Sequence, residues 1–244
     1  MMSRVIERAD DVAPIAPDAS RLLPVVPELS GVLPWPGLRR GATVAVLGSA
    51  SLVLALLAAP MAAGSWAAVV GIPHLGAVAA GEYGLDLSHL ALIPSPGEQW
   101  ATVTAALIDG IDLVVVAPPR NVPAGTAQSL MARARQRGAV LLPTGQPWPG
   151  SDLALTVTQR RWQGLGKGRG RLRLQDVTIA SDGRGRAQRR RTVTTTLPPA
   201  SLAARIAAVP GQVPGVPPNR MIDPDRIFRD QQQMATRWRH KNVG

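Results

Sequence analysis

Short apolar runs alternate with longer segments of helical character through the middle of the chain. The runs at residues 43–47 (TVAVL), 66–70 (WAAVV) and 112–116 (DLVVV) are almost continuously apolar, which is typical of strands buried on both faces. Segments of helical length and spacing, such as residues 124–137, separate them. This strand-helix-strand series predicts right-handed crossovers and an α/β fold whose sheet is mainly parallel and flanked by helices.

Turn and capping signals set the expected bounds of these elements. Pro60 is expected to end a helix before it, and Gly138 to cap the helix over 124–137, whose basic last turn suits the helix dipole. We expect strands at 43–47, 66–70, 90–93, 112–116 and 140–142, and helices at 52–59, 74–83, 98–108 and 124–137.

The pattern changes after Gly150. Residues 153–157, 170–179 and 192–196 are rich in Val and Thr and alternate in polarity, which predicts antiparallel strands added to one edge of the sheet. Residues 181–191 (SDGRGRAQRRR) read as a basic hairpin loop. We therefore divide the chain into a mobile leader (1–30), a core with this hairpin (31–198), and a linker with a partner-binding helix (199–244).

A membrane span is the main alternative for the apolar region. Residues 41–81 contain no Asp, Glu, Lys or Arg, and this length would permit a transmembrane helix. Gly48, Pro60 and Gly64 instead divide the region into short pieces, whose turns would leave backbone groups unpaired in lipid. The N-terminus has no apolar signal-peptide region. We expect no membrane association and a cytoplasmic protein.

Composition removes several kinds of site. The chain has no cysteine, so it has no disulfide, thiolate nucleophile or sulfur-ligated metal. Aromatic residues make up 3% of it, which argues against base-stacking platforms. His74, His89 and His240 are far apart in sequence, and we expect no metal site.

The net charge of +11 is concentrated in one part of the chain. Residues 159–205 hold twelve Lys or Arg and two acidic residues, Asp176 and Asp182. Such a block favours an anionic partner, either nucleic acid or an acidic protein surface, although a basic loop that only aids solubility would read the same way.

The turn after residues 43–47 is where a phosphate-binding loop would lie, with the spacing G-x-x-x-x-G-K-[ST] counted from Gly48. Val53 stands at the second glycine, Leu54 at the lysine that would reach the phosphates, and Ala55 at the hydroxyl that would hold magnesium. A lone glycine before a helix is too little to hold a triphosphate.

Residues 33–118 resemble the RecA family. Leu38-Arg39-Arg40-Gly41 is similar to the family's entry to its first core strand, and residues 66–94, ending GEYGLDLSHLALIP, to its second strand, helix and following turn. The run from Ile111 to Val116 (IDLVVV) resembles the Walker B strand. The resemblance implies a RecA-like core.

The same resemblance implies that the hydrolytic residues are lost. Ala117 stands where the family has its strand-end Asp, and Ile72 where it has the catalytic Glu. With Leu54 and Ala55, every position that would stabilise charge or activate water is aliphatic. We expect no enzyme activity and no cofactor, and we expect the former nucleotide pocket to be packed core.

Residues 171–198 (RLRLQDVTIASDGRGRAQRRRTVTTTLP) resemble the ending of the ImuA group, RecA-like proteins encoded with damage-tolerance polymerases. The degenerate nucleotide site and the Ala-, Arg-, Gly- and Pro-rich composition are similar in particular to the actinobacterial ImuA-prime branch. That resemblance implies an accessory role in a mutasome, with ImuB, a Y-family polymerase relative, and an error-prone C-family replicative polymerase as partners. It also implies association with the nucleoid after DNA damage.

Two groups of residues are candidates for partner binding. The first group could meet phosphate or an acidic surface, and comprises Arg169, Arg171, Arg173, Arg184, Arg186, Arg189, Arg190 and Arg191. The second lies on a helix expected after Asp223-Pro224-Asp225, which either docks in a partner's groove or packs back on the core; it comprises Ile227, Phe228, Met234 and Trp238.

Three functions stay open on the sequence. The first is a non-catalytic adaptor of a translesion complex, for which DNA is a further candidate partner. The second is a regulator that pairs with RecA or its filament in SOS or cell-division control. The third is a residual nucleotide-binding enzyme. An unrelated α/β domain would share the general pattern.

Overall fold

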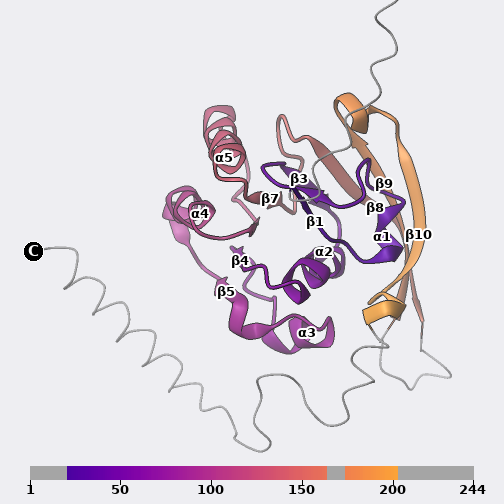
Figure 1. Cartoon of the computed structure of the whole chain (residues 1–244). Helices are drawn as coiled ribbons and strands as arrows, with labels where there is room; N and C mark the ends of the chain where they lie inside the picture. Colours follow the sequence, from indigo (N-terminus) through magenta and orange to yellow (C-terminus); the bar gives the residue numbers. More distant parts are fainter. Residues whose placement is uncertain (1–20, 164–173, 203–244) are drawn as a thin grey trace, which may run out of the picture. The chain divides into compact units, whose positions relative to one another are not determined.

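The computed structural model describes residues 21–163 and 174–202, all within one compact unit. Its helices and 3-10 turns, labelled in Figure 1 where space allows, are α1 (Pro27–Ser30), α2 (Ala50–Ala62), α3 (Ala77–Glu82), η2 (Leu87–His89), η3 (Gly97–Gln99), α4 (Trp100–Ile108), α5 (Ala124–Arg137) and η4 (Gly185–Gln188). Its strands are β1 (Leu22–Leu23), β2 (Leu38–Arg39), β3 (Val44–Leu47), β4 (Ala67–Val70), β5 (Leu90–Ile93), β6 (Leu113–Val116), β7 (Val140–Pro143), β8 (Leu153–Gln163), β9 (Leu174–Gly183) and β10 (Arg191–Leu197).

Two four-stranded ladders make up the main sheet. One has the order β5-β4-β6-β7 and is parallel throughout, and the other has the order β10-β9-β8-β3. β8 runs parallel to β3, while β9 and β10 are antiparallel additions. The two ladders meet at β3 and β7 through isolated parallel bridges, Thr43 to Leu141 and Val46 to Thr144. The expected α/β class, with antiparallel strands near the C-terminal end, is confirmed.

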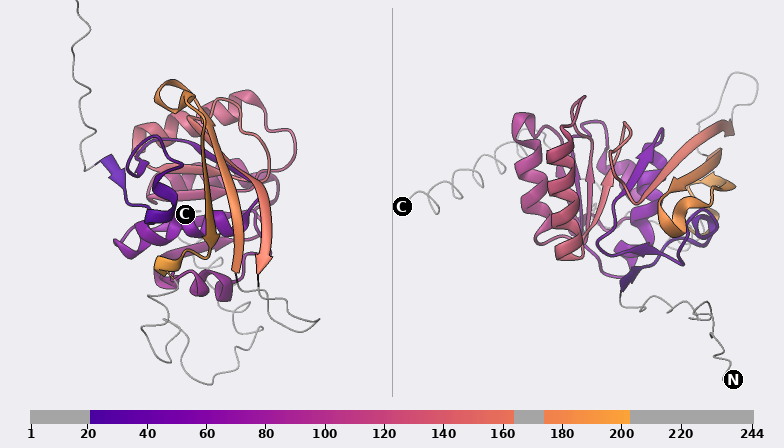
Figure 2. Two further views of the ribbon diagram at one scale, coloured as in Figure 1. Left: turned by 90° about the vertical axis from the view of Figure 1, so that its right-hand side faces the viewer. Right: turned by 90° about the horizontal axis from the view of Figure 1, so that it is seen from above.

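Alternate residues of the buried strands face two separate cores. Leu113 and Val115 of β6 pack with α2 in the larger core, whereas Val114 and Val116 pack with α4 and α5 in the smaller one. The two views in Figure 2 show α4 and α5 together on one side of the parallel strands, with α2 on the other. A strand that is covered on both faces has no polar position, which explains its continuous apolar sequence.

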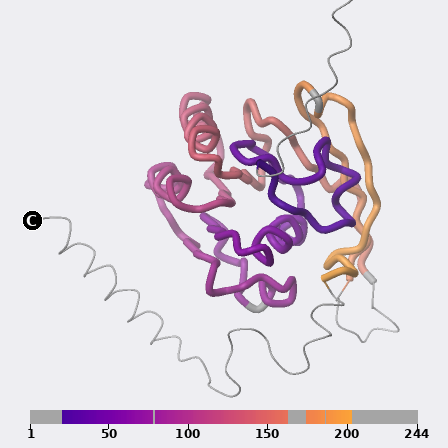
Figure 3. The backbone as a smooth tube through the Cα atoms, viewed as in Figure 1, coloured from indigo at the N-terminus to yellow at the C-terminus, as the bar shows by residue number. Residues whose placement is uncertain are grey.

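The packed structure begins earlier than the sequence suggested. Leu23, Val26 and Leu29 lie within the assigned leader, yet they are buried in the larger core. Figure 3 shows this N-terminal segment, in indigo, beside β10 in orange. Glu28 accepts hydrogen bonds from the backbone and hydroxyl of Ser201, at 2.9 and 2.8 Å, so residues near 201 also pack on the core.

Two further bounds differ from expectation. α2 continues through Pro60 to Ala62, because a proline this near the C-terminus interrupts only the last turn of the helix. β9 reaches Gly183, so that part of the assigned hairpin loop is strand. By contrast, the bounds of β5 and α5 match the expected ones, and Gly138 caps α5 with a φ of 73°.

No helix in the described ranges is long and apolar enough to cross a membrane. The apolar region at residues 41–81 is instead divided among β3, α2, β4 and α3. Residues 41–81 therefore do not form one transmembrane helix, which agrees with the interpretation based on the internal turns of this region.

Candidate functional site

The turn between β3 and α2 has the backbone form of a strand-to-helix loop. Gly48 adopts a φ of 83°, which favours glycine over any residue with a side chain. Ser49 caps α2 by accepting a hydrogen bond at Oγ from the Leu52 N–H, at 3.2 Å. The loop therefore lies at the carboxyl end of β3, where α/β sheets carry their ligands.

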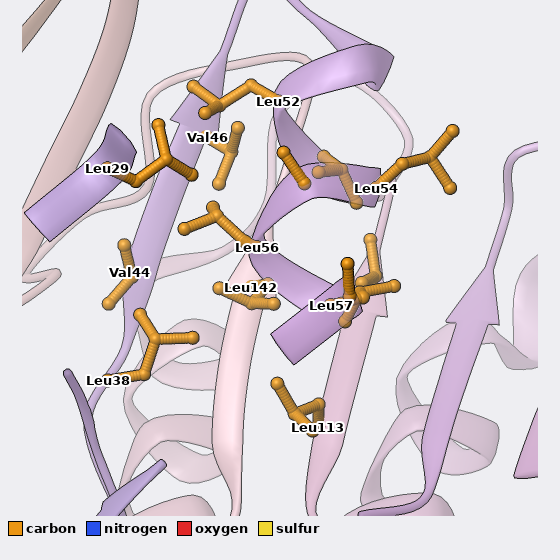
Figure 4. Close-up of a cluster of buried hydrophobic side chains, with 14 of the residues drawn as sticks. Leu29, Leu38, Val44, Val46, Leu52, Leu54, Leu56, Leu57, Leu113 and Leu142 are labelled. Carbon is orange, nitrogen blue, oxygen red and sulfur yellow. The ribbon is translucent and has the colours of Figure 1, made fainter. Parts of the chain in front are cut away.

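Aliphatic side chains fill the first turns of α2 behind this loop. Val53 and Ala55 are fully buried, and Leu54 is 3% exposed. Figure 4 shows Leu54 in a cluster with Leu56 and Leu57 from the same helix. At the two positions where the lysine and the hydroxyl were sought, Leu54 and Ala55 present apolar groups.

Ile72 and Ala117 follow the carboxyl ends of β4 and β6 and are both half-buried. The Ala117 N–H donates to the Val70 carbonyl at 2.9 Å, which extends the ladder past the end of both strands. A Cβ on Gly71 would come within 2.5 Å of the Ala117 carbonyl oxygen, so the two turns are in close contact. Ile72 and Leu54 both line one pocket, and Ala117 does not line it.

Two adjoining hollows are present at this end of the sheet, where packed core was expected. One of about 390 Å³ lies over the β3–α2 turn, and one of about 280 Å³ lies between α2, α3 and the end of β10. Both are lined by Ala50, Ser51, Trp162 and Gln175. We name this continuous depression the carboxyl-end groove.

Among the polar and aromatic groups of the groove are three from β8 and β9 that the sequence did not single out. Arg160 extends from β8 and donates a hydrogen bond to the Gly48 carbonyl. Trp162 is 48% exposed, and Gln175 of β9 lies directly opposite it in the strand register. Gln175 is only 2% exposed, and its Oε1 has no hydrogen-bond partner. Its signal in the sequence is its position on the inward face of β9, shared with Val177 and Ile179.

Tyr83 closes the inner wall of the groove. Burial raises the pKa of its hydroxyl, and a hydrogen bond with Ser51 opposes this rise. The phenol is therefore neutral at physiological pH, so it adds polarity but no charge.

The basic hairpin lies at the opposite end of the sheet. The Arg184 N–H donates to the Asp152 carbonyl at 3.2 Å, just before β8 begins, so the turn from β9 to β10 lies at the amino end of the parallel strands. Arg184, Arg189 and Arg190 are exposed. Arg191 is half-buried, with an Nε that has no partner, and Arg186 belongs to η4. The structure brings these residues together on one turn.

The remaining candidates fall outside the described ranges. These are Arg169, Arg171 and Arg173 between β8 and β9, and Ile227, Phe228, Met234 and Trp238 in the C-terminal segment. Within the described ranges, no cluster of three His, Asp or Glu side chains is arranged to hold a metal ion.

Comparison with known proteins shows similarity to solved structures, to a curated relative and to a family model. A crystal structure of the RadB recombinase is similar over 70% of this chain and 92% of the recombinase chain, with 15% identity and a TM-score of 0.49. An uncharacterized protein of Mycobacterium tuberculosis (strain ATCC 25618 / H37Rv), Rv3395c, is 50% identical over 110 residues, which are 44% of this chain and 54% of the relative. The chain thus matches about half the length of this relative. Residues 31–150, which contain β3 to β7, match the family model of the MT3502 N-terminal domain.

Proposed function

We propose that this protein is a non-catalytic, RecA-like accessory factor of a DNA damage-induced mutasome. It would support mutagenic translesion synthesis by binding partners rather than by hydrolysing ATP. The observation that carries the non-catalytic part is the start of α2, where Leu54 and Ala55 are buried in the apolar core at the positions of the phosphate-binding lysine and hydroxyl.

Phosphoryl transfer requires positive charge at the transferred group and a means of activating water. Neither requirement is met by Leu54, Ala55, Ile72 or Ala117. Arg160 is the one Lys or Arg among the described residues that line the groove, and a single guanidinium is less positive charge than a triphosphate requires. A triphosphate at this turn would therefore lack the charge that normally stabilises it.

The mutasome part of the proposal rests on the resemblance of residues 171–198 to the ImuA group. The proposed partners are an ImuB-type relative of Y-family polymerases and, directly or through it, an error-prone C-family polymerase. DNA is a further candidate partner through the exposed arginines of the β9–β10 turn. The protein would act in the cytoplasm and would join the nucleoid after damage.

A second function is favoured by one edge of the sheet. β5 has the apolar sequence LALI, none of its residues is fully buried, and within the described ranges it pairs only with β4. An open apolar edge strand can accept a strand from another chain. This favours a regulator that pairs with RecA or its filament, and co-sedimentation with RecA filaments would distinguish the two functions.

The first experiment tests nucleotide binding. Equilibrium dialysis of the full chain against labelled ATP with magnesium should show no saturable binding at micromolar concentrations, and phosphate release should equal that of buffer. RecA serves as the positive control in the same cells. Saturable micromolar binding would overturn the non-catalytic assignment.

The second experiment tests the partner. An ImuB-type protein should co-purify with the full chain, and removal of Met221 to Gly244 should abolish this binding while the melting temperature of the core is unchanged. A full-length Arg120→Ala variant, altered in an exposed residue of the turn after β6, is the matched control and should bind normally. Full affinity of the truncated chain would contradict the assignment of this segment.

A further inference from the structure

We propose that the carboxyl-end groove binds an extended peptide segment of a partner protein, with an acidic side chain at Arg160 and an aliphatic side chain between α2 and α3. This assignment goes beyond the mutasome proposal, because it rests on the groups in the groove and not on the identity of the complex.

The first observation is the unpartnered amide of Gln175. This side chain is almost completely buried, and its Oε1 has no partner although it lines both hollows. A buried acceptor without a partner is costly, so a ligand that donates a hydrogen bond to it would be stabilised. A carboxamide offers one acceptor and two donors, a pattern complementary to the N–H and C=O of a peptide backbone.

The second observation is the exposed indole of Trp162. It lies opposite Gln175 on the neighbouring strand and lines both hollows, yet almost half of its surface is open to solvent. Tryptophan is enriched among the residues that dominate protein interfaces, because it buries a large area and keeps one polar N–H. Its position gives a bound segment an apolar surface beside the Gln175 amide.

The two ends of the groove differ in chemistry. The end between α2 and α3 has an aliphatic part, which includes Leu54, Ile72 and Leu75, beside the polar or aromatic residues Ser51, His74, Glu82 and Tyr83. The other end has Arg160 and the N-terminus of α2, both of which attract negative charge. A segment with an acidic residue close to an aliphatic one in sequence matches both ends.

A nucleic acid strand would match the groove less well. Single-strand sites use a series of cations that follow the backbone, together with several stacking surfaces. The described residues of the groove include one arginine, Arg160. The end of the groove between α2 and α3 has aliphatic side chains where a single-strand site would have further stacking surfaces. A peptide is therefore the ligand class that these groups favour.

A displayed library of random octapeptides, selected on the full-length protein, tests the proposal. The selected peptides should carry Asp or Glu within a few residues of Leu, Ile or Val. Synthetic copies should bind in a fluorescence polarisation titration, and Trp162→Ala should weaken them about tenfold or more. Trp66→Ala is the matched control, since Trp66 is 47% exposed at the amino end of β4, and it should leave affinity unchanged.

Two further variants separate recognition from folding. Gln175→Leu should weaken the peptides about tenfold while leaving the melting temperature equal or higher, because an unpartnered amide is replaced by an apolar group of similar size. A clear drop in melting temperature would mean that Gln175 serves the fold, and would overturn its assigned role. Arg160→Glu should reverse the charge preference, so that the library yields Lys or Arg in place of acidic residues.

Other results would reject the peptide assignment. The peptide assignment would be rejected outright if every selected peptide bound the Trp162→Ala and Gln175→Leu variants as tightly as the natural protein. A single-stranded 20-nucleotide DNA whose binding depends on the same two residues would assign the groove to nucleic acid. Competition by a synthetic peptide of this chain's own residues 221–244 would assign it to the chain itself. The selection leaves the mutasome proposal untouched, because ImuB binding is measured separately.

Discussion

Single side chains decide whether the β3–α2 turn can bind phosphate. Leu54 and Ala55 are buried in the larger core, so these two positions contribute to packing. Their burial removes apolar area from water, which stabilises the fold. A lysine in place of Leu54 would put an ammonium group among aliphatic side chains, at a cost in stability.

Leu56 should be among the most sensitive positions in the molecule. It is fully buried between α2 and the sheet, and truncation to alanine leaves a cavity as well as losing transfer free energy. Leu56→Ala should lower the free energy of unfolding by about 2–5 kcal/mol in urea titrations. Leu92→Ala, at a leucine 37% exposed on β5, should cost clearly less, and equal losses would contradict the described packing.

Gly71 is a second sensitive position, for a reason of backbone geometry. Its φ of 77° and the Ala117 carbonyl next to it leave no room for a side chain. Gly71→Ala should therefore destabilise the protein by more than 1 kcal/mol, roughly the penalty for a left-handed residue with a Cβ. Gly110→Ala, where a Cβ would meet nothing within 4 Å, is the control for thermal melting, and a similar shift in both variants would argue against this reason.

The sequence predicted the site only in part at the residue scale. The turn between β3 and α2 could be recognised, because the sequence signal is local and Gly48 marks the turn. The groove could not be recognised, because Trp162 and Gln175 meet through strand pairing between β8 and β9. A polar residue on the inward face of β9 is a weak signal until the pocket it faces is known.

At the scale of elements, α4 and α5 are joined by a small ionic network. Asp109, just after α4, accepts from Arg133 Nε at 2.8 Å and from Arg137 Nε at 3.1 Å. The hydrogen bond from Arg133 is the main reason that the pKa of Asp109 falls to about 2. A carboxyl group with a lowered pKa contributes stability above its ordinary value, and this contribution is lost as the pH falls.

Asp109→Asn should therefore lower the melting temperature at pH 7 in dilute salt. The difference from the natural sequence should shrink as the pH falls below about 4 and disappear only below about 2, because the folded-state pKa of Asp109 is about 2 and the carboxyl is protonated in both folded and unfolded states only below that value. Salt should also reduce it, because the three side chains are partly exposed. Asp182→Asn, at an exposed carboxylate of β9, is the charge-matched control, and a pH-independent difference would contradict this account.

Helices and strands could be predicted where the hydrophobic periodicity agreed with the turn and capping residues that mark the end of an element. α5 has both, with helical spacing and a glycine at its end, and its bounds matched. β1 and α1 were missed because they contain two and four residues, too few to show a period within a segment rich in proline and aspartate. The end of α2 was misjudged because proline acts differently in the last turn of a helix than in its middle.

At the scale of the whole molecule, the arginine-rich β9–β10 turn and the carboxyl-end groove lie at opposite ends of the sheet. The exposed arginines of the β9–β10 turn are at the amino end, and the groove is at the carboxyl end. Strand direction could be predicted from the sequence, but the pairing that brings β8 beside β3 could not. That pairing decides which basic residues lie far from the β3–α2 turn.

The arginine turn should bind polyanions in a salt-dependent manner. Arg189→Ala should weaken binding to a single-stranded 20-nucleotide DNA and reduce the slope of log K against log salt by about 0.7, the effect of one lost phosphate contact. Arg120→Ala, which removes an exposed arginine from the turn after β6, should leave the slope unchanged. Identical slopes for all three proteins would show that this turn does not meet phosphate.

The seam between β3 and β7 has a consequence for motion. Neighbouring strand pairs form ladders of four residues, whereas this pair has two isolated bridges, so the sheet has a line along which the two ladders can separate. Local opening of this kind exposes backbone amides to hydrogen exchange at a lower free energy than global unfolding. Thr144 forms one of the bridges and also lines the groove, as does Ser49. Any occupant that spans these two residues would hold the ladders together and slow amide exchange on both sides of the seam.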